Sequence, residues 1–170
     1  MGVAVLSDTG LTAVLIYFVV YLFMNLGAFY VVMLVADKTG SEDIDSYKGL
    51  GYRSPLIGVS MVVFFIALTG IPPTAGFIGK LFLFVALLDA KWIWLAVVGA
   101  LNSVVSLYYY VRVLRNMFLR DPEEGSGPIR FSFPQVVVLL LLVIPTLLFG
   151  LYYGPIVDWA NASVAMFGVR

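Results

Sequence analysis

Three long apolar runs divide the chain, and each is long enough to cross a lipid bilayer as a helix. They cover residues 11–36, 92–117 and 135–153. A helical span needs roughly 20 apolar residues to cross about 30 Å of hydrocarbon. The pattern therefore predicts an all-α membrane protein, built as a polytopic bundle of transmembrane helices.

A fourth apolar stretch, residues 57–88, is interrupted near its centre by Gly70-Ile71-Pro72-Pro73. It could form two short spans joined by a turn, or one span with an unwound centre. A continuous helix over this stretch would be about 48 Å long, whereas each half holds only about 16 residues, fewer than a span needs. Length therefore favours a single discontinuous helix.

The basic residues support the discontinuous helix. With one broken span, seven Lys and Arg residues fall on one side of the membrane, and only Lys91 and Arg170 on the other. Two separate spans would divide the same residues about evenly. Because cytoplasmic loops carry an excess of Lys and Arg, we predict four spans in one membrane domain over residues 1–170. Cytoplasmic loops would cover about 37–54 and 118–134, with both termini on the opposite face. The seven residues are Lys38, Lys48, Arg53, Arg112, Arg115, Arg120 and Arg130.

The composition excludes a soluble domain and narrows the chemistry. The 170 residues are 62% hydrophobic and 12% charged, with a mean hydropathy of +1.02, whereas soluble domains carry about 25% charged residues. Without His or Cys, the chain offers no ligand set for haem, iron–sulfur clusters or structural zinc, so we expect no cofactor or metal in it. The net charge of +0 gives no reason to expect nucleic acid as a partner.

The residues of the interruption are the first candidates for chemistry. Pro72 and Pro73 donate no backbone hydrogen bond, so carbonyls near residues 68–69 lose their partners within the helix. Irregular backbone at membrane depth is tolerated where it is buried in protein or lines water, and interrupted helices form ion sites in many transporters. A proline kink that serves only helix packing is the alternative. The predicted break comprises Pro72, Pro73, Thr74, Gly76 and Gly79.

Lys80 follows the break among apolar residues. A lysine at the centre of a span costs about 2.5–3.5 kcal/mol on the insertion scale. Asp89 and Lys91 mark the nearest predicted membrane surface, about 15 Å along a helix, which is too far for the amine to reach by snorkelling. Because a lysine amine taken out of water can release its proton, we predict that Lys80 is a proton carrier.

Further polar residues within the spans are candidates for a water wire. Side chains of this kind also serve as hydrogen-bonding contacts between helices, and the sequence leaves both roles open. The residues lie on two helical faces. One face carries Tyr17, Tyr21 and Asn25, and the other carries Asn102, Ser106 and Tyr109, flanked by Ser103 and Tyr110.

Two strings of residues resemble a known family. Leu68-Thr69-Gly70-Ile71-Pro72-Pro73-Thr74-Ala75-Gly76-Phe77-Ile78-Gly79-Lys80, followed by Ser106-Leu107-Tyr108-Tyr109-Tyr110-Val111-Arg112, is similar to the antiporter-like membrane subunits of respiratory complex I, the NADH-quinone oxidoreductase. Asn25-Leu26-Gly27-Ala28-Phe29 fits the same family, and the resemblance covers nearly the whole chain. It implies that 57–88 is a discontinuous helix and that Lys80 is its proton-carrying lysine. The chain would then be the C-terminal part of a longer subunit.

The resemblance also implies a function and a setting. The chain would belong to a translocase subunit that moves protons while quinone is reduced elsewhere in the complex, with no redox catalysis of its own. Flavin, iron–sulfur clusters and quinone would be held by partner subunits. The implied partners are other membrane-arm subunits, the missing N-terminal part and the lipid bilayer of an energy-transducing membrane, the bacterial cytoplasmic membrane. A subunit of a multi-subunit Na⁺/H⁺ antiporter and a purely structural membrane module are the alternatives.

Overall fold

The computed structural model describes residues 2–5, 7–122 and 127–167, and all regular secondary structure in these ranges is helical. This confirms the predicted all-α class. The elements are α1 (Gly2–Val5), α2 (Asp8–Thr39), the 3₁₀-helix η1 (Ile44–Tyr47), α3 (Leu50–Arg53), α4 (Pro55–Thr69), α5 (Ala75–Asp89), α6 (Ile93–Leu119), α7 (Phe133–Leu151) and α8 (Gly154–Phe167).

Three of these helices, α2, α6 and α7, are long and apolar enough to cross a membrane. They have 32, 27 and 19 residues respectively, and roughly 20 are needed for a span. They coincide with the three uninterrupted runs of the sequence. The prediction of a multi-pass membrane protein is therefore confirmed.

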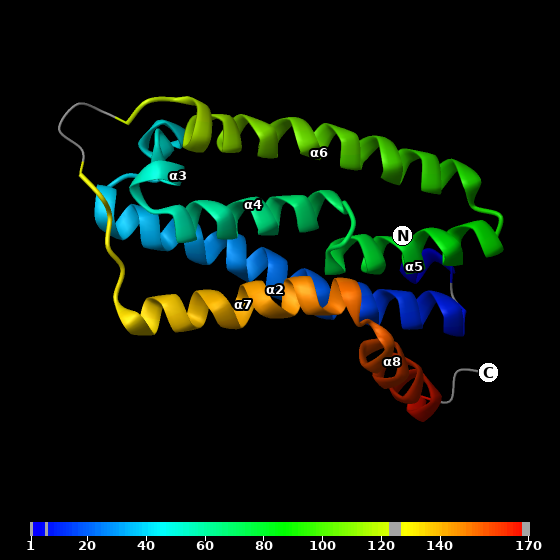
Figure 1. Cartoon of the computed structure of the whole chain (residues 1–170). Coiled ribbons are helices and arrows are strands. Elements are labelled where there is room, and N and C mark those ends of the chain that lie inside the picture. The colour runs from blue at the N-terminus through cyan, green and yellow to red at the C-terminus, as the bar shows by residue number, and fades with distance from the viewer. Residues whose placement is uncertain (1, 6, 123–126, 168–170) are drawn as a thin grey trace.

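The interrupted stretch forms two helices. α4 and α5 have 15 residues each and are separated by residues 70–74. Figure 1 shows α5 continuing along the bundle from the place where α4 ends, instead of folding back beside it. α2 packs against both helices. Each helix is shorter than the roughly 20 residues that a span needs.

α2 is the central helix of the bundle and contacts α4, α5, α7 and α8. Glycines allow the neighbouring helices to come close to it. A Cβ atom on Gly27 of α2 would overlap the ring of Phe64 on α4, and one on Gly79 of α5 would lie 2.8 Å from Cγ2 of Val20 on α2. The break between α4 and α5 is therefore held against the middle of α2. The buried side chains of α2 include Ile16, Val20, Met24, Val31 and Leu34.

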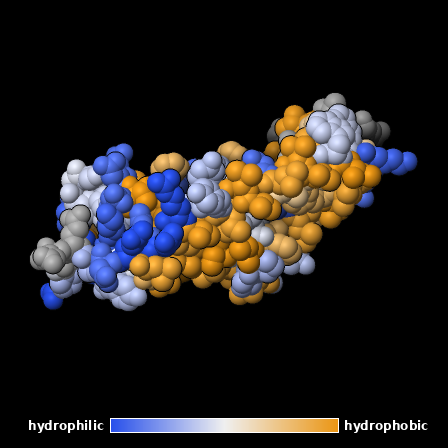
Figure 2. Space-filling view, turned by 90° about the horizontal axis from the view of Figure 1, so that it is seen from above, coloured by the Kyte–Doolittle hydropathy of each residue, from blue (hydrophilic) through white to orange (hydrophobic). Residues whose placement is uncertain are grey.

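The polar connections gather at one end of the bundle, which we call the loop end and define as the described residues of 37–54 and 118–132. Figure 2 shows most of the hydrophilic side chains of the visible face at this end, a few at the opposite tip, and mainly hydrophobic ones in between. The first connection is more regular than the sequence indicates, because it contains η1 and α3, which bury Tyr47 and Leu50. Two backbone hydrogen bonds hold the first connection, from Gly49 N to the Asn116 carbonyl of α6 at 3.1 Å and from Ile129 N of the second connection to the Arg53 carbonyl at 3.0 Å.

The last helix, α8, is a feature that our sequence analysis did not predict. Two residues separate it from the end of α7, and Figure 1 shows it turning away from the direction of α7. Its buried side chains Ile156, Ala160 and Val164 recur every fourth residue. That spacing is typical of a helix with one buried face, but a search for spans overlooks a segment of only 14 residues.

Candidate functional site

The helical backbone is interrupted at Gly70, directly after α4. α4 ends with Gly70 in the left-handed conformation, at φ 88°, which glycine adopts without strain. The Gly70 N–H donates to the carbonyls of Ile66 and Ala67, both at 3.0 Å, and the Ile71 N–H donates to Ile66 at 3.1 Å. The next two residues are prolines without an N–H. The carbonyls of Leu68 and Thr69 are therefore left without backbone donors from the following turn.

The start of α5 is packed tightly below this turn. Thr74 is buried and its hydroxyl donates to the Ile71 carbonyl at 2.7 Å. A Cβ atom on Gly76 would collide with the carbonyl oxygen of Ala67, so only glycine allows the first turn of α5 to approach the last turn of α4 this closely. On α7, a Cβ atom on Gly150 would collide with the Pro73 carbonyl. Close contacts between α4 and α5 and between α7 and Pro73 thus fix the geometry of the break.

The Lys80 amine binds the carbonyls that the break leaves free. Its Nζ donates to the Leu68 carbonyl at 3.0 Å and to the Thr69 carbonyl at 2.8 Å. A third bond goes to Oγ of Ser103 on α6, at 2.9 Å. Since an ammonium group has three donors and no acceptor, these three oxygens satisfy the protonated amine completely.

The partners of Lys80 are neutral. Among the described residues, the ion pairs involve Lys38 and Lys48 at the loop end, and none involves Lys80. The carbonyl end of a helix carries a partial negative charge, and Leu68 and Thr69 are the last two residues of α4. The ammonium charge is therefore stabilised by oriented backbone dipoles and a hydroxyl group instead of a carboxylate.

A cavity of about 590 Å³ opens beside the amine. It lies between α2, α5 and α6, and both apolar and polar side chains line it. A space of this size with several hydrogen-bonding groups can hold ordered water, which gives the amine a route for exchanging its proton. Its polar lining residues are Tyr17, Tyr21, Lys80, Asn102, Ser103, Ser106 and Tyr110.

The structure brings together some of the predicted water-wire residues and leaves others apart. Ser103 touches Lys80, and Asn102 and Ser106 line the cavity. Asn25 is half-buried and does not line it, while Tyr109 is 60% exposed and points elsewhere. The cavity wall contains Tyr110 in its place.

The three tyrosines of the cavity, Tyr17, Tyr21 and Tyr110, lie on or beside the two polar faces predicted from the sequence, and helical spacing favours Tyr110 over Tyr109. Asn102, Ser106 and Tyr110 recur every fourth residue and so share one helical face. Tyr17 and Tyr21 of α2 lie opposite, with their rings stacked at 5.6 Å. No sequence pattern indicates that this face of α2 meets α6 across a cavity.

The described residues offer no place for a metal ion built from protein side chains. No group of three or more His, Cys, Asp or Glu residues lies close enough together in this part of the chain.

A family model and the sequences of curated relatives both assign the chain to the same family. Residues 1–106 match the family described as NADH:quinone oxidoreductase/Mrp antiporter, TM. The whole chain is 45% identical to NADH-quinone oxidoreductase subunit N of Chlorobium chlorochromatii (strain CaD3), of which it covers 34%. It is 48% identical, over 98% of its length, to NADH-quinone oxidoreductase subunit N 2 of Sorangium cellulosum (strain So ce56), of which it covers 33%. The predicted resemblance is thereby confirmed, and the chain spans about a third of the length of these curated relatives.

The fold has a counterpart among solved structures. A chain in the structure of the Mrp complex from Dietzia sp. DQ12-45-1b superposes with a TM-score of 0.80 at 22% sequence identity. The match covers 96% of the present chain and 39% of the Dietzia chain. The helical arrangement described above therefore recurs in a chain of the Mrp complex.

Proposed function

The chain belongs to the NADH:quinone oxidoreductase/Mrp antiporter family of transmembrane proteins, and we propose that it is part of a proton-translocating membrane subunit of an NADH-quinone oxidoreductase. In this proposal Lys80 carries the proton. Quinone reduction takes place in partner subunits, which hold the flavin and the iron–sulfur clusters. The remainder of the subunit and other membrane-arm subunits complete the proton path in the bacterial cytoplasmic membrane.

The observation that carries the proposal is the set of contacts of the Lys80 amine. When protonated, Nζ donates to two free carbonyls and to the Ser103 hydroxyl. When the proton leaves into the cavity, the neutral amine gains a lone pair. The Ser103 hydroxyl, which now donates to the Gly99 carbonyl at 3.2 Å, can rotate and donate to that lone pair. Both charge states of the amine then have partners without movement of the helices.

We further propose that α4 and α5 together form one discontinuous span, giving the chain four spans. Support comes from their end-to-end arrangement and from their shared contact with α2. The unwound residues between them would lie near the bilayer centre, where irregular backbone is tolerated when protein or water surrounds it. The loop end would then face the cytoplasm.

Cysteine labelling tests this topology, since the chain has no cysteine of its own. A cysteine replacing Ser46 should react with an impermeant maleimide only from the cytoplasmic side. A cysteine replacing the exposed Asp89 should react only from the opposite side. Reaction of both positions from one side would replace the discontinuous span by a hairpin of two short helices.

Substitution of Lys80 tests the proton-carrying role. Lys80→Met keeps the length of the side chain but holds no proton, and Lys80→Arg keeps a charge that is not released. In proteoliposomes with a pH-sensitive dye, both variants should lower the proton-to-electron stoichiometry by the share that this subunit contributes. Lys38→Met, at an exposed lysine of the loop end, is the matched control and should pump normally. Normal stoichiometry in both Lys80 variants would leave the chain as a structural module.

A second function, that of a subunit in a multi-subunit cation/proton antiporter, is favoured by one observation, the fold shared with the Mrp complex chain. The two assemblies differ in their cofactors. The purified complex that contains this chain should show flavin and iron–sulfur absorbance if our first proposal holds. Absence of both, together with Na⁺-dependent proton exchange in proteoliposomes, would support the antiporter.

A further inference from the structure

The short helix α8 has three distinct faces. One face packs into the bundle through Ile156, Ala160 and Val164, which are at most 6% exposed. Two other faces are open. Trp159 and Met166 lie on one of them and are 50% and 87% exposed. The second open face carries the exposed Asp158 and Ala165, seven residues apart and so about two helical turns apart on the same side.

A hydrogen bond fixes the level of α8 along the bundle. The Thr12 hydroxyl of α2 donates to Oδ1 of Asn161 at 3.2 Å. Thr12 lies one turn after Asp8, the exposed first residue of α2. An exposed carboxylate at the end of a spanning helix marks water, because charged groups inside the bilayer are costly. The middle of α8 is therefore close to the membrane surface that lies opposite the loop end.

The tryptophans of the chain lie at the same level along the bundle as the middle of α8. Of the three tryptophans, two, Trp92 and Trp94, lie at the start of α6, and Trp159 lies on α8. All three are exposed, between 39% and 63%. Tryptophan is enriched where the headgroups meet the hydrocarbon, because its ring is apolar and its N–H is polar. The tryptophans thus cluster at the end of the bundle that carries the starts of α2 and α6.

We propose that α8 is an interfacial helix bound to the lipid surface opposite the loop end, with Trp159 and Met166 in the lipid and Asp158 and Ala165 in water. Each open face then meets the surroundings that suit its side chains. At 14 residues, α8 is too short to cross the bilayer, and an amphipathic helix of this kind binds in the plane of the interface. The proposal rests on the membrane-spanning helices and is independent of proton transfer by Lys80.

Nitroxide labels test the proposal in the assembled complex, reconstituted into phosphatidylcholine and phosphatidylglycerol vesicles. Single cysteines replace Asp158, Trp159, Ala165 and Met166, and collision with oxygen is compared with collision with a water-soluble nickel chelate. The oxygen-to-nickel ratio should be several-fold higher at Trp159 and Met166 than at Asp158 and Ala165. Val105 on the exposed apolar side of α6 and Glu42 at the loop end calibrate lipid and water, and the labelled wild-type complex provides the background.

Two results would overturn the proposal. Equal, water-like ratios at all four positions would mean that α8 leaves the membrane surface. Exclusion of both oxygen and nickel at Trp159 and Met166 would mean that a neighbouring protein subunit covers this face. Because all four side chains are exposed, labelling should leave the packing of the bundle intact, and normal assembly of each variant verifies this.

Discussion

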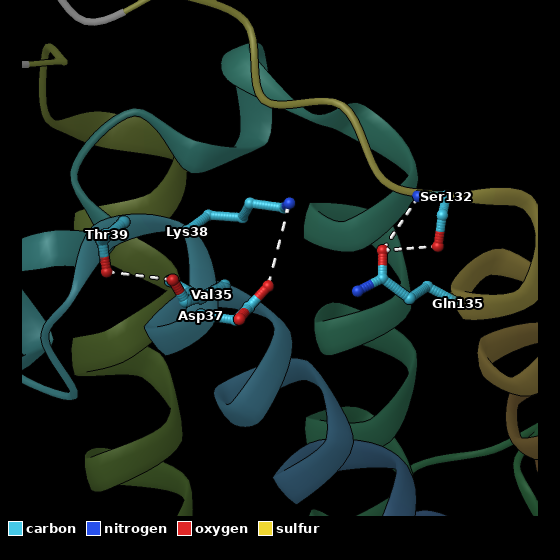
Figure 3. Close-up of polar contacts among 6 residues, drawn as sticks. All are labelled: Val35, Asp37, Lys38, Thr39, Ser132 and Gln135. Atoms are coloured by element: carbon cyan, nitrogen blue, oxygen red, sulfur yellow. Dashed lines mark hydrogen bonds and ion pairs between the residues drawn. The ribbon is translucent and has the colours of Figure 1, made fainter.

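Lysine side chains lie in two contrasting regions of this molecule. At the loop end, Lys38 is 3.7 Å from the Asp37 carboxylate and Lys48 is 3.4 Å from that of Asp45. Figure 3 shows the first of these pairs beside the start of α7, where the Ser132 N–H and hydroxyl both donate to the Gln135 side-chain oxygen. At the break, Lys80 pairs with none of the carboxylates in the described part of the chain and binds neutral oxygens.

The difference follows from the solvent around each lysine. Exposed ion pairs are screened by water, and each contributes at most about 1 kcal/mol. Inside a bilayer a carboxylate partner would stabilise the charged amine strongly and oppose release of its proton. Backbone carbonyls and a hydroxyl stabilise the charge less, so they can hold a proton that must later leave. Under our proposal, the charge of its partner therefore distinguishes a lysine that only forms an ion pair from one that carries protons.

Among substitutions that compare the break with the loop end, we expect replacement of the prolines to have the largest effect on proton translocation. Replacing Pro72 and Pro73 together by Ala returns two N–H groups and removes ring clashes worth roughly 3 kcal/mol each within a helix. The Leu68 and Thr69 carbonyls would then accept from the backbone, and Lys80 would lose two partners. We expect proton translocation by this subunit to be lost while NADH oxidation and assembly persist.

The matched control is Pro55→Ala, directly after the loop end. Pro55 is at the start of α4, where its missing N–H has no helical partner anyway. Pumping in proteoliposomes should be unchanged by this substitution. If the double variant also pumps normally, the prolines serve packing alone.

We expect a smaller difference in pumping between variants in which Ala replaces one of two glycines that end helices. Gly40 ends α2 at φ 72° and Gly70 ends α4 at φ 88°, so Ala costs about 1–2 kcal/mol at either position from backbone strain. An added Cβ meets nothing within 4 Å at Gly40, but at Gly70 it lies 2.7 Å from Cδ of Lys80. Gly70→Ala should therefore reduce pumping as well as thermal stability, whereas Gly40→Ala should reduce stability alone. Equal pumping by the two variants would show that the position of the Lys80 side chain is not critical.

The smallest effect concerns Ser103. Ser103→Ala removes one neutral partner of Nζ, at a cost of about 1 kcal/mol, which is roughly a fivefold change in the proton affinity of the amine, and we expect pumping to slow by no more than a similar factor. Ser106→Ala is the control on the same helix, because Ser106 lines the cavity but donates to the Asn102 carbonyl. Pumping rates measured at equal amounts of assembled complex compare the two. A stronger effect of Ser106 than of Ser103 would place the proton route along the cavity wall and away from the Lys80 contact.

Local features of this site could be predicted from the sequence. A lysine in an apolar stretch and two adjacent prolines each have a physical cost that must be offset nearby. That reasoning singled out Lys80 and the carbonyls near residues 68–69, which the structure joins by hydrogen bonds. Such inferences need only the residues of one stretch and the geometry of a single helix.

Features that depend on how helices are rotated against one another could not be predicted. The contact between Lys80 and Ser103 requires knowing which face of α6 meets α5, and the sequence does not fix this. The same is true of Tyr109, which lies outside the cavity, and Tyr110, which lines it. α8 escaped prediction because its 14 residues are too few for a span and polar residues interrupt its apolar ones.

The central claim is that the amine of Lys80, and not its bulk, moves the proton. The most direct measurement uses Lys80→Cys in the assembled complex, treated with 2-bromoethylamine or with iodoethane and verified by mass spectrometry. The first reagent rebuilds an amine at the lysine distance, with sulfur in place of Cγ, and the second adds a similar chain without an amine. The treated wild-type complex controls for cysteines in partner subunits. We predict that aminoethylation restores the proton-to-electron stoichiometry that Lys80→Cys and its ethylated form have lost. Equal stoichiometry in the aminoethylated and ethylated forms would contradict the claim.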